Sequence, residues 1–287
     1  MLSCFGEGVD AQLLDRKPFR FDHRLMGHPS LSIENLARVI PRLPASQVMY
    51  STRMLSTSDN FEKTFRQRPL DRSIEETIET LRTSDSYIMV SSPQTDESLR
   101  DLYESLIGDV EALMHERGIA GKAVTPKLYL FLASPNSVTP FHIDRYSTFL
   151  LQFRGSKQVT VSMPFDDRVV TQENCENYVA YVNTQLPWRP ELDAYSTCFD
   201  FAPGQALHIP FVAGHHVRNG AEDVSISMSI IFNTPETMMW REALNFNQRA
   251  RKWFGRMGYR PAPVGEGGVR DGLKAGAWRA YARVRSY

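Results

Sequence analysis

The sequence predicts an all-β core of antiparallel strands, a barrel or a sandwich, with helices around it. Short strand-like runs follow one another between residues 124 and 234, turn signals separate them, and helical patterns lie on both sides. Apolar residues make up 42% of the 287-residue chain, so a large hydrophobic core is expected and wholesale disorder is not.

The strand-like runs read KLYLFLAS, TFLLQFRG, KQVTVSMP, QALHIPF and VSISMSIIF. Dipeptides that are typical of turns separate them, at Pro135-Asn136, Gly155-Ser156, Pro203-Gly204 and Asn219-Gly220. The section from 166 to 194 is less regular, and we interpret it as an insertion or a lid.

Helical patterns precede this region. SIENLARVI starts at a candidate N-cap, Ser32, and stops before Pro41. SIEETIETLRTS opens with Ser73 and Glu76 in the spacing of a capping box. ESLRDLYESLIGDVEALMHERG has an apolar stripe and ends at Gly118, and the run SYIMVSS before it predicts a short buried strand.

We therefore expect three parts. Residues 1–123 form a mixed helical and strand segment that packs on the core, residues 124–235 form the β-rich core, and residues 236–287 form a basic helical segment. The net charge of the chain is zero, but residues 241–287 contain 11 Lys and Arg against 3 Asp and Glu, a local charge of +8. A solvated helical surface is the favoured interpretation of this charge, over a nucleic-acid site.

Cysteine content and hydropathy predict a cytoplasmic protein. The three cysteines, Cys4, Cys175 and Cys198, are widely spaced, which is not typical of a disulfide framework and suits a reducing compartment. The first residues lack the pattern of a signal peptide, and no apolar stretch is long enough to predict a membrane span.

The strongest chemical signal is the stretch TPFHIDRYSTFLLQFRGSK, residues 139–157. His142 and Asp144 are two residues apart, so in a strand their side chains would share one face. The later stretch PGQALHIPFVAGHHV supplies a third ligand from the pair His215-His216. Two imidazoles and one carboxylate form the facial triad of Fe(II) oxygenases, which leaves positions open for O₂ and a bidentate co-substrate such as 2-oxoglutarate.

The far carboxylate of such a co-substrate needs a cation, and Lys157 fits that need. It follows the turn at Gly155-Ser156, so its strand can run back beside the preceding one. Hydroxyl groups of Thr139, Thr148 and Ser229 are candidates for further hydrogen bonds. A His-x-Asp sequence alone is common, and its combination with the lysine and the later histidine makes the metal site the favoured interpretation.

The stretches SVTPFHIDRYSTFLLQFRGSKQVTV, FAPGQALHIPFVAGHHV and VSISMSIIF resemble the JmjC and cupin-like Fe(II)- and 2-oxoglutarate-dependent oxygenases, closest to their hydroxylase branch. The resemblance covers about residues 124–234. It implies a double-stranded β-helix, or jelly roll, with helices outside. It also implies that Fe(II), 2-oxoglutarate and O₂ are used to hydroxylate a protein or peptide side chain or a small molecule, with succinate and CO₂ as products.

The resemblance also implies a role for each matching residue. His142 and Asp144 match the first two metal ligands, and His215 matches the distal histidine, so that His216 is expected to point away. Lys157 matches the lysine that binds the C5 carboxylate of 2-oxoglutarate, and Thr139 matches a hydroxyl that shares this carboxylate.

Three further residues are implied to contact 2-oxoglutarate. Tyr87 matches a tyrosine that hydrogen-bonds the co-substrate, and Thr148 and Ser229 stand where relatives often have asparagine. Ala213-Gly214 replaces the aromatic pair that usually precedes the distal histidine, which would open space beside the metal.

Two other functions stay open at this point: a metal-binding cupin that acts as a sensor, and a regulator associated with nucleic acid through the basic tail. We favour a homodimer contact for the helix expected over 236–258, because the corresponding helices of relatives often form one. His208 is expected to pack at the pocket wall without binding metal, and Arg145 and Tyr146 are candidates for substrate contact at the mouth.

Overall fold

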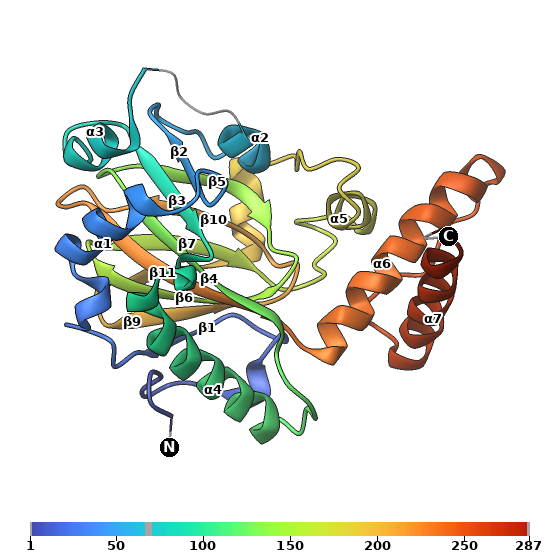
Figure 1. Ribbon diagram of the computed structural model, residues 1–287. Coiled ribbons are helices and arrows are strands. Elements are labelled where there is room, and N and C mark those ends of the chain that lie inside the picture. Colours follow the sequence, from blue (N-terminus) through green and yellow to red (C-terminus); the bar gives the residue numbers. More distant parts are fainter. Residues whose placement is uncertain (1, 67–70, 286–287) are drawn as a thin grey trace.

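The computed structural model describes residues 2–66 and 71–285. Within these residues, two antiparallel sheets face each other, with strand orders β1-β9-β6-β11-β4-β3-β2 and β5-β10-β7-β8 (Figure 1). The predicted jelly roll with surrounding helices is confirmed. The strands are β1 (Phe19–Asp22), β2 (Val48–Ser51), β3 (Tyr87–Ser91), β4 (Val124–Ala133), β5 (Val138–Ile143), β6 (Ser147–Arg154), β7 (Lys157–Ser162), β8 (Ser196–Phe201), β9 (Gln205–Ile209), β10 (Gly214–Asn219) and β11 (Ser225–Asn233).

Helices lie outside the two sheets, and α6 and α7 form a pair that stands apart from the barrel (Figure 1). The predicted caps are present: the Ser32 side chain accepts a hydrogen bond from the backbone N–H of Asn35, and Ser73 and Glu76 form a capping box. The helices are α1 (Ile33–Val39), α2 (Phe61–Arg66), α3 (Ile74–Glu79), α4 (Arg100–Glu116), α5 (Gln172–Val179), α6 (Pro235–Phe254) and α7 (Gly268–Arg285).

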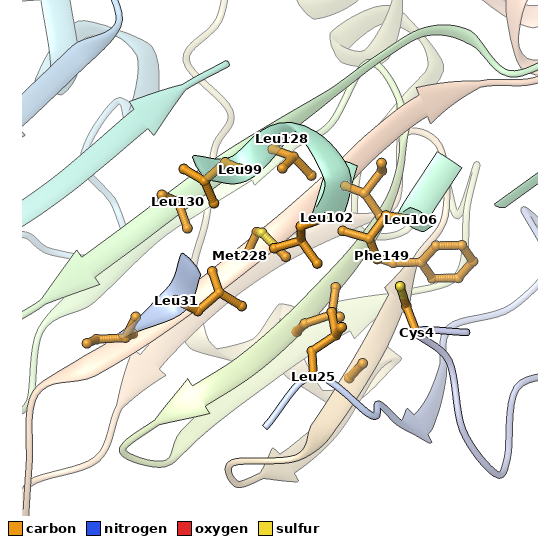
Figure 2. Close-up of a cluster of buried hydrophobic side chains, with 14 of the residues drawn as sticks. Cys4, Leu25, Leu31, Leu99, Leu102, Leu106, Leu128, Leu130, Phe149 and Met228 are labelled. Atoms are coloured by element: carbon orange, nitrogen blue, oxygen red, sulfur yellow. The ribbon is translucent and has the colours of Figure 1, made fainter. Parts of the chain in front are cut away.

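The outer face of the larger sheet forms the main hydrophobic core. Side chains alternate along each strand, so every second residue of β4, β6 and β11 points toward α4 and the N-terminal segment. Figure 2 shows part of this cluster, in which the α4 side is represented by Leu102 and Leu106 and the sheet side by Leu130, Phe149 and Met228. These five side chains are at most 2% exposed.

Two smaller clusters complete the core. One lies between the two sheets and includes Leu150, Val159 and Val217. The other joins α5 and α6 to β5 through residues such as Phe141 and Trp240. The second cluster attaches the start of α6 to the barrel, close to the loop that precedes His215.

Strands β1, β2 and β3 belong to the first 123 residues, and they extend the larger sheet at both of its edges. The division of the chain at residues 123 and 235 stays a prediction. Among the helices that the structure describes, none is long and apolar enough to cross a membrane.

Candidate metal centre

The pairing of β5 with β10 places two histidines side by side inside the barrel. His215 pairs with His142 and Val217 pairs with Thr139, so two steps along β10 correspond to three along β5. This extra residue is a bulge, and it lets both Thr139 and His142 face the cavity although they are three residues apart. The expectation that His142 and Asp144 share a strand was wrong in one respect: β5 ends at Ile143, just before Asp144.

The three predicted ligands converge. Nε2 of His142 lies 3.8 Å from Oδ1 of Asp144, and Nε2 of His215 lies 3.9 Å from Oδ2 of the same carboxylate. One ligand atom from each residue can be chosen so that all lie within 4.8 Å of one another, a spacing that a single ion can bridge.

The histidines are held in the form that binds metal. Nδ1 of His142 donates to the backbone oxygen of Pro140 at 2.8 Å, and Nδ1 of His215 donates to that of Ala213 at 3.0 Å. Each Nε2 is then left with its lone pair toward the site. Burial, and next the neighbouring His215, lower the pKa of His142 to about 3, so its ring is neutral at physiological pH. The donor set therefore fits a divalent metal such as Fe(II).

Two contacts orient these ligands. The Thr148 hydroxyl donates to Oδ2 of Asp144 at 2.7 Å, and the Phe61 ring stacks on His142 with ring centroids 4.0 Å apart. Thr148 was predicted to bind the co-substrate, and the structure gives its hydroxyl a partner in the ligand carboxylate. Phe61 comes from the short helix α2, and no sequence signal connected it to the metal site.

The triad opens into a cavity of about 270 Å³ that also contains Lys157. The lysine side chain is buried, and its Nζ donates to Oγ of Ser227 at 2.8 Å. In residues 2–66 and 71–285, no carboxylate forms an ion pair with it. Burial lowers the pKa of Lys157 to about 7, because an ammonium group loses hydration there without a compensating negative charge. An anionic ligand in the cavity would supply that charge.

The other predicted co-substrate residues line the same cavity. The Thr139 hydroxyl donates to the Tyr87 hydroxyl at 3.1 Å, and Ser229 faces the cavity from β11. Burial raises the pKa of Tyr87 to about 12, so its hydroxyl keeps its proton and can act as a donor. Ser227, two residues before Ser229 on the same face of β11, was not predicted, because a serine in a strand has no distinctive pattern.

Arg145 closes one side of the cavity mouth. Its guanidinium forms an ion pair with Glu62 at 2.5 Å and donates to the backbone oxygen of Tyr178. It also lies 3.7 Å from the ring centroid of Tyr181. Because Arg145 is buried in these contacts, it joins α2 and α5 across the mouth, and its predicted contact with substrate stays a prediction.

The remaining histidines do not join the triad. His216 points away as expected, and its Nε2 lies 3.1 Å from a carboxylate oxygen of Asp193. His208 does not bind at the site, but its predicted place at the pocket wall was wrong. It pairs with Phe149 on the outer face of the sheet, where its ring contacts Phe19.

The buried carboxylate of Asp15 forms hydrogen bonds with both of the segments that supply Asp144 and His215. Asp15 accepts hydrogen bonds from the Ser147 hydroxyl at 2.8 Å and from the backbone N–H of Phe211 at 3.0 Å. Ser147 lies three residues after Asp144, and Phe211 lies four residues before His215. The N-terminal segment therefore supports the candidate metal centre from behind.

Comparison with known proteins agrees with this fold. The family model of the cupin-like domain matches residues 36–238. No curated protein matches the sequence. Among solved structures, that of Escherichia coli ycfD has 14% sequence identity and a TM-score of 0.52, covering 98% of this chain and 69% of that one. A second structure, of the Escherichia coli ribosomal oxygenase YcfD, has 11% identity and a TM-score of 0.51, covering 98% and 68%.

Proposed function

The chain belongs to the cupin-like domain family, and from this premise and its site we propose that it is an Fe(II)- and 2-oxoglutarate-dependent oxygenase. One observation carries the proposal: the triad of His142, Asp144 and His215 faces the same cavity as the buried Lys157. A cupin that only binds metal has no need of a buried cation in the cavity of its metal ligands. The name of the ribosomal oxygenase with a similar fold is consistent with this choice.

Each residue has a defined task in this proposal. His142, Asp144 and His215 hold the metal, and Thr148 fixes the carboxylate of Asp144. Lys157, with Ser227 beside it, binds the far carboxylate of 2-oxoglutarate. When bound, Fe(II) uses O₂ and 2-oxoglutarate to hydroxylate a substrate C–H bond, with succinate and CO₂ as products.

The remaining predicted residues complete the pocket for the co-substrate. We assign the hydroxyl groups of Thr139 and Tyr87 to the carboxylate held by Lys157, and Ser229 to a further hydrogen bond, because all three residues line the same cavity as the lysine. Leu150 and Val217 make part of the wall apolar, which excludes water from the reaction.

The decisive experiment incubates the protein with Fe(II), ascorbate and 2-oxoglutarate and measures succinate. We expect slow succinate formation without added substrate, and its loss together with Fe(II) binding in His215→Ala. His216→Ala is the matched control, because this neighbouring ring points away from the site. Metal binding without succinate formation or 2-oxoglutarate binding would instead favour the sensor. Metal content unchanged by His142→Ala would refute the site.

The substrate that we propose is a protein or peptide side chain or a small molecule, in a reducing compartment such as the cytoplasm. The three cysteines are all free thiols, which agrees with such a compartment.

A homodimer that forms through the C-terminal helices is also part of the proposal. Its support is the set of large apolar side chains on α6 and α7 that are more than half exposed, Trp253, Val269, Leu273 and Val284. Native mass spectrometry that detects only monomer would refute this part.

A further inference from the structure

Two cations lie at the aromatic rim of the cavity, and among the described residues neither has an acidic partner. Nζ of Lys127 lies 5.4 Å from the ring centroid of Tyr129 and 5.9 Å from that of Tyr146. The guanidinium carbon of Arg241, on α6, lies 5.7 Å from the Tyr146 ring. Both tyrosines line the cavity, so the two positive charges flank its aromatic rim.

Two other arginines, one at the cavity and one on α6, have acidic partners. Arg145 pairs with Glu62, and Arg251 pairs with Glu176. In the described parts of the chain, 2–66 and 71–285, neither Lys127 nor Arg241 has a carboxylate within 4.0 Å. These two half-buried cations are therefore available to an external anion.

The strand geometry separates these cations from Lys157. Lys127 pairs with Ile231 on β11, whereas the hydroxyl that contacts Lys157 belongs to Ser227, four residues earlier on that strand. Four residues span about 13 Å at 3.3 Å per residue. The carboxylate carbons of a five-carbon diacid are only about 5 Å apart, given C–C bonds of about 1.5 Å. The backbone positions are therefore farther apart than 2-oxoglutarate is long, and we assign Lys157 and Lys127 to different ligands.

We propose that Lys127 and Arg241 select a substrate with an anionic group, a carboxylate or a phosphate, next to an apolar or aromatic body. The anion lies between the two cations, and the body packs on Tyr129 and Tyr146 on its way to the metal centre. This inference rests on the proposed function for calling the ligand a substrate. It names the chemistry by which the mouth recognises that substrate.

The test measures binding to the protein loaded with Fe(II) and saturating 2-oxoglutarate without oxygen. Phenylacetate and phenyl phosphate are compared with neutral phenylacetamide and cationic phenethylamine. A second arm compares acetyl-Tyr-Glu-Tyr amide with its Gln counterpart, which distinguishes a free small acid from an acidic side chain. We expect the anionic member to bind roughly 10- to 100-fold more tightly in at least one arm, because hydrogen bonds to charged groups are worth about 1.5–3 kcal/mol.

Lys127 and Arg241 are each replaced by Gln, singly and together. We expect these variants to lose the preference for the anionic probe, while their affinity for 2-oxoglutarate stays unchanged. Lys252→Gln on the same helix is the matched control, and thermal melting shows that each variant is folded. Equal binding of charged and neutral probes in both arms, or an unaltered preference in the double variant, overturns the inference. Absence of succinate formation in the wild type would instead refute the proposed function. The binding measurement is made without oxygen, so its result does not depend on whether succinate forms.

Discussion

On β11, Met228, Ile230 and Phe232 point outward and are fully buried against the helical side of the sheet. On the same strand Ser227, Ser229 and Ile231 point into the cavity. The outer residues are apolar and closely packed, whereas the inner ones include hydroxyl groups and face a space large enough for ligands.

The difference teaches how one sheet serves two purposes. Burial of the outer face supplies much of the hydrophobic stabilisation, in proportion to the apolar area removed from water. The inner face meets Lys157 of the smaller sheet, a buried lysine with a strongly lowered pKa, and this arrangement costs stability until a ligand binds. Substitutions on the outer face should therefore mainly lower the free energy of unfolding, whereas substitutions that line the cavity should mainly weaken ligand binding.

The largest effect on stability is expected from Leu130→Ala on the outer face. Leu130 is fully buried, and its truncation leaves a cavity that should lower the free energy of unfolding by about 2–5 kcal/mol. Urea denaturation measures this loss. Metal and 2-oxoglutarate affinities of the folded protein should stay as in the wild type, and a large loss of either affinity would show that the two faces are coupled.

Lys157→Met, in the cavity that the inner face lines, should give the opposite result. It removes the cation that we propose for 2-oxoglutarate binding, so the dissociation constant should rise roughly 10- to 100-fold, equivalent to about 1.5–3 kcal/mol. Stability of the ligand-free protein should not fall, because the lost group was a buried and unpaired charge. Calorimetric titration and thermal melting measure the two effects, and a destabilised variant with normal affinity would contradict the assignment.

The same lysine predicts a pH dependence. Its pKa is about 7 in the fold and 10.5 in the unfolded chain, so between these values only the unfolded chain binds the proton. Unfolding free energy should therefore rise with pH across this window, by at most about 1.4 kcal/mol per unit, and this contribution should be absent in Lys157→Met. Affinity for 2-oxoglutarate should fall above about pH 7. Denaturation and titration at a series of pH values measure both trends, and identical slopes in wild type and variant would argue against them.

A smaller effect is expected from Thr148→Val, which keeps the shape of the side chain but removes the hydroxyl that contacts Asp144. Partners of metal ligands typically contribute 10- to 100-fold to affinity, and we expect the lower part of that range for Fe(II). Thr148→Ser should restore binding. If Thr148→Val instead weakened 2-oxoglutarate binding alone, the hydroxyl would belong to the co-substrate site.

The sequence was most informative where the site is local. The jelly-roll strands, the spacing of His142 and Asp144, and Lys157 after its turn could all be predicted, because alternation and turn chemistry act over a few residues. The bulge in β5 could not, because no glycine marks it, although it decides which way Thr139 faces.

Contacts between distant segments also escaped prediction. Phe61 stacks on His142 from a helix of six residues, and Glu62 beside it pairs with Arg145. The pairing of Lys127 with Ile231 likewise depends on sheet register, which periodicity alone does not fix.

The position of Asp15 in the chain limits which fragments of the protein can be expressed with an intact metal centre. The segment that matches the family, residues 36–238, contains every proposed metal ligand but not this carboxylate or β1. A fragment expressed with those boundaries would leave the Ser147 hydroxyl and the Phe211 amide without their shared acceptor. During synthesis, Asp15 leaves the ribosome long before both partners, so it is already available when they emerge. Minimal expression fragments and circular permutants should therefore keep this N-terminal segment joined to the barrel.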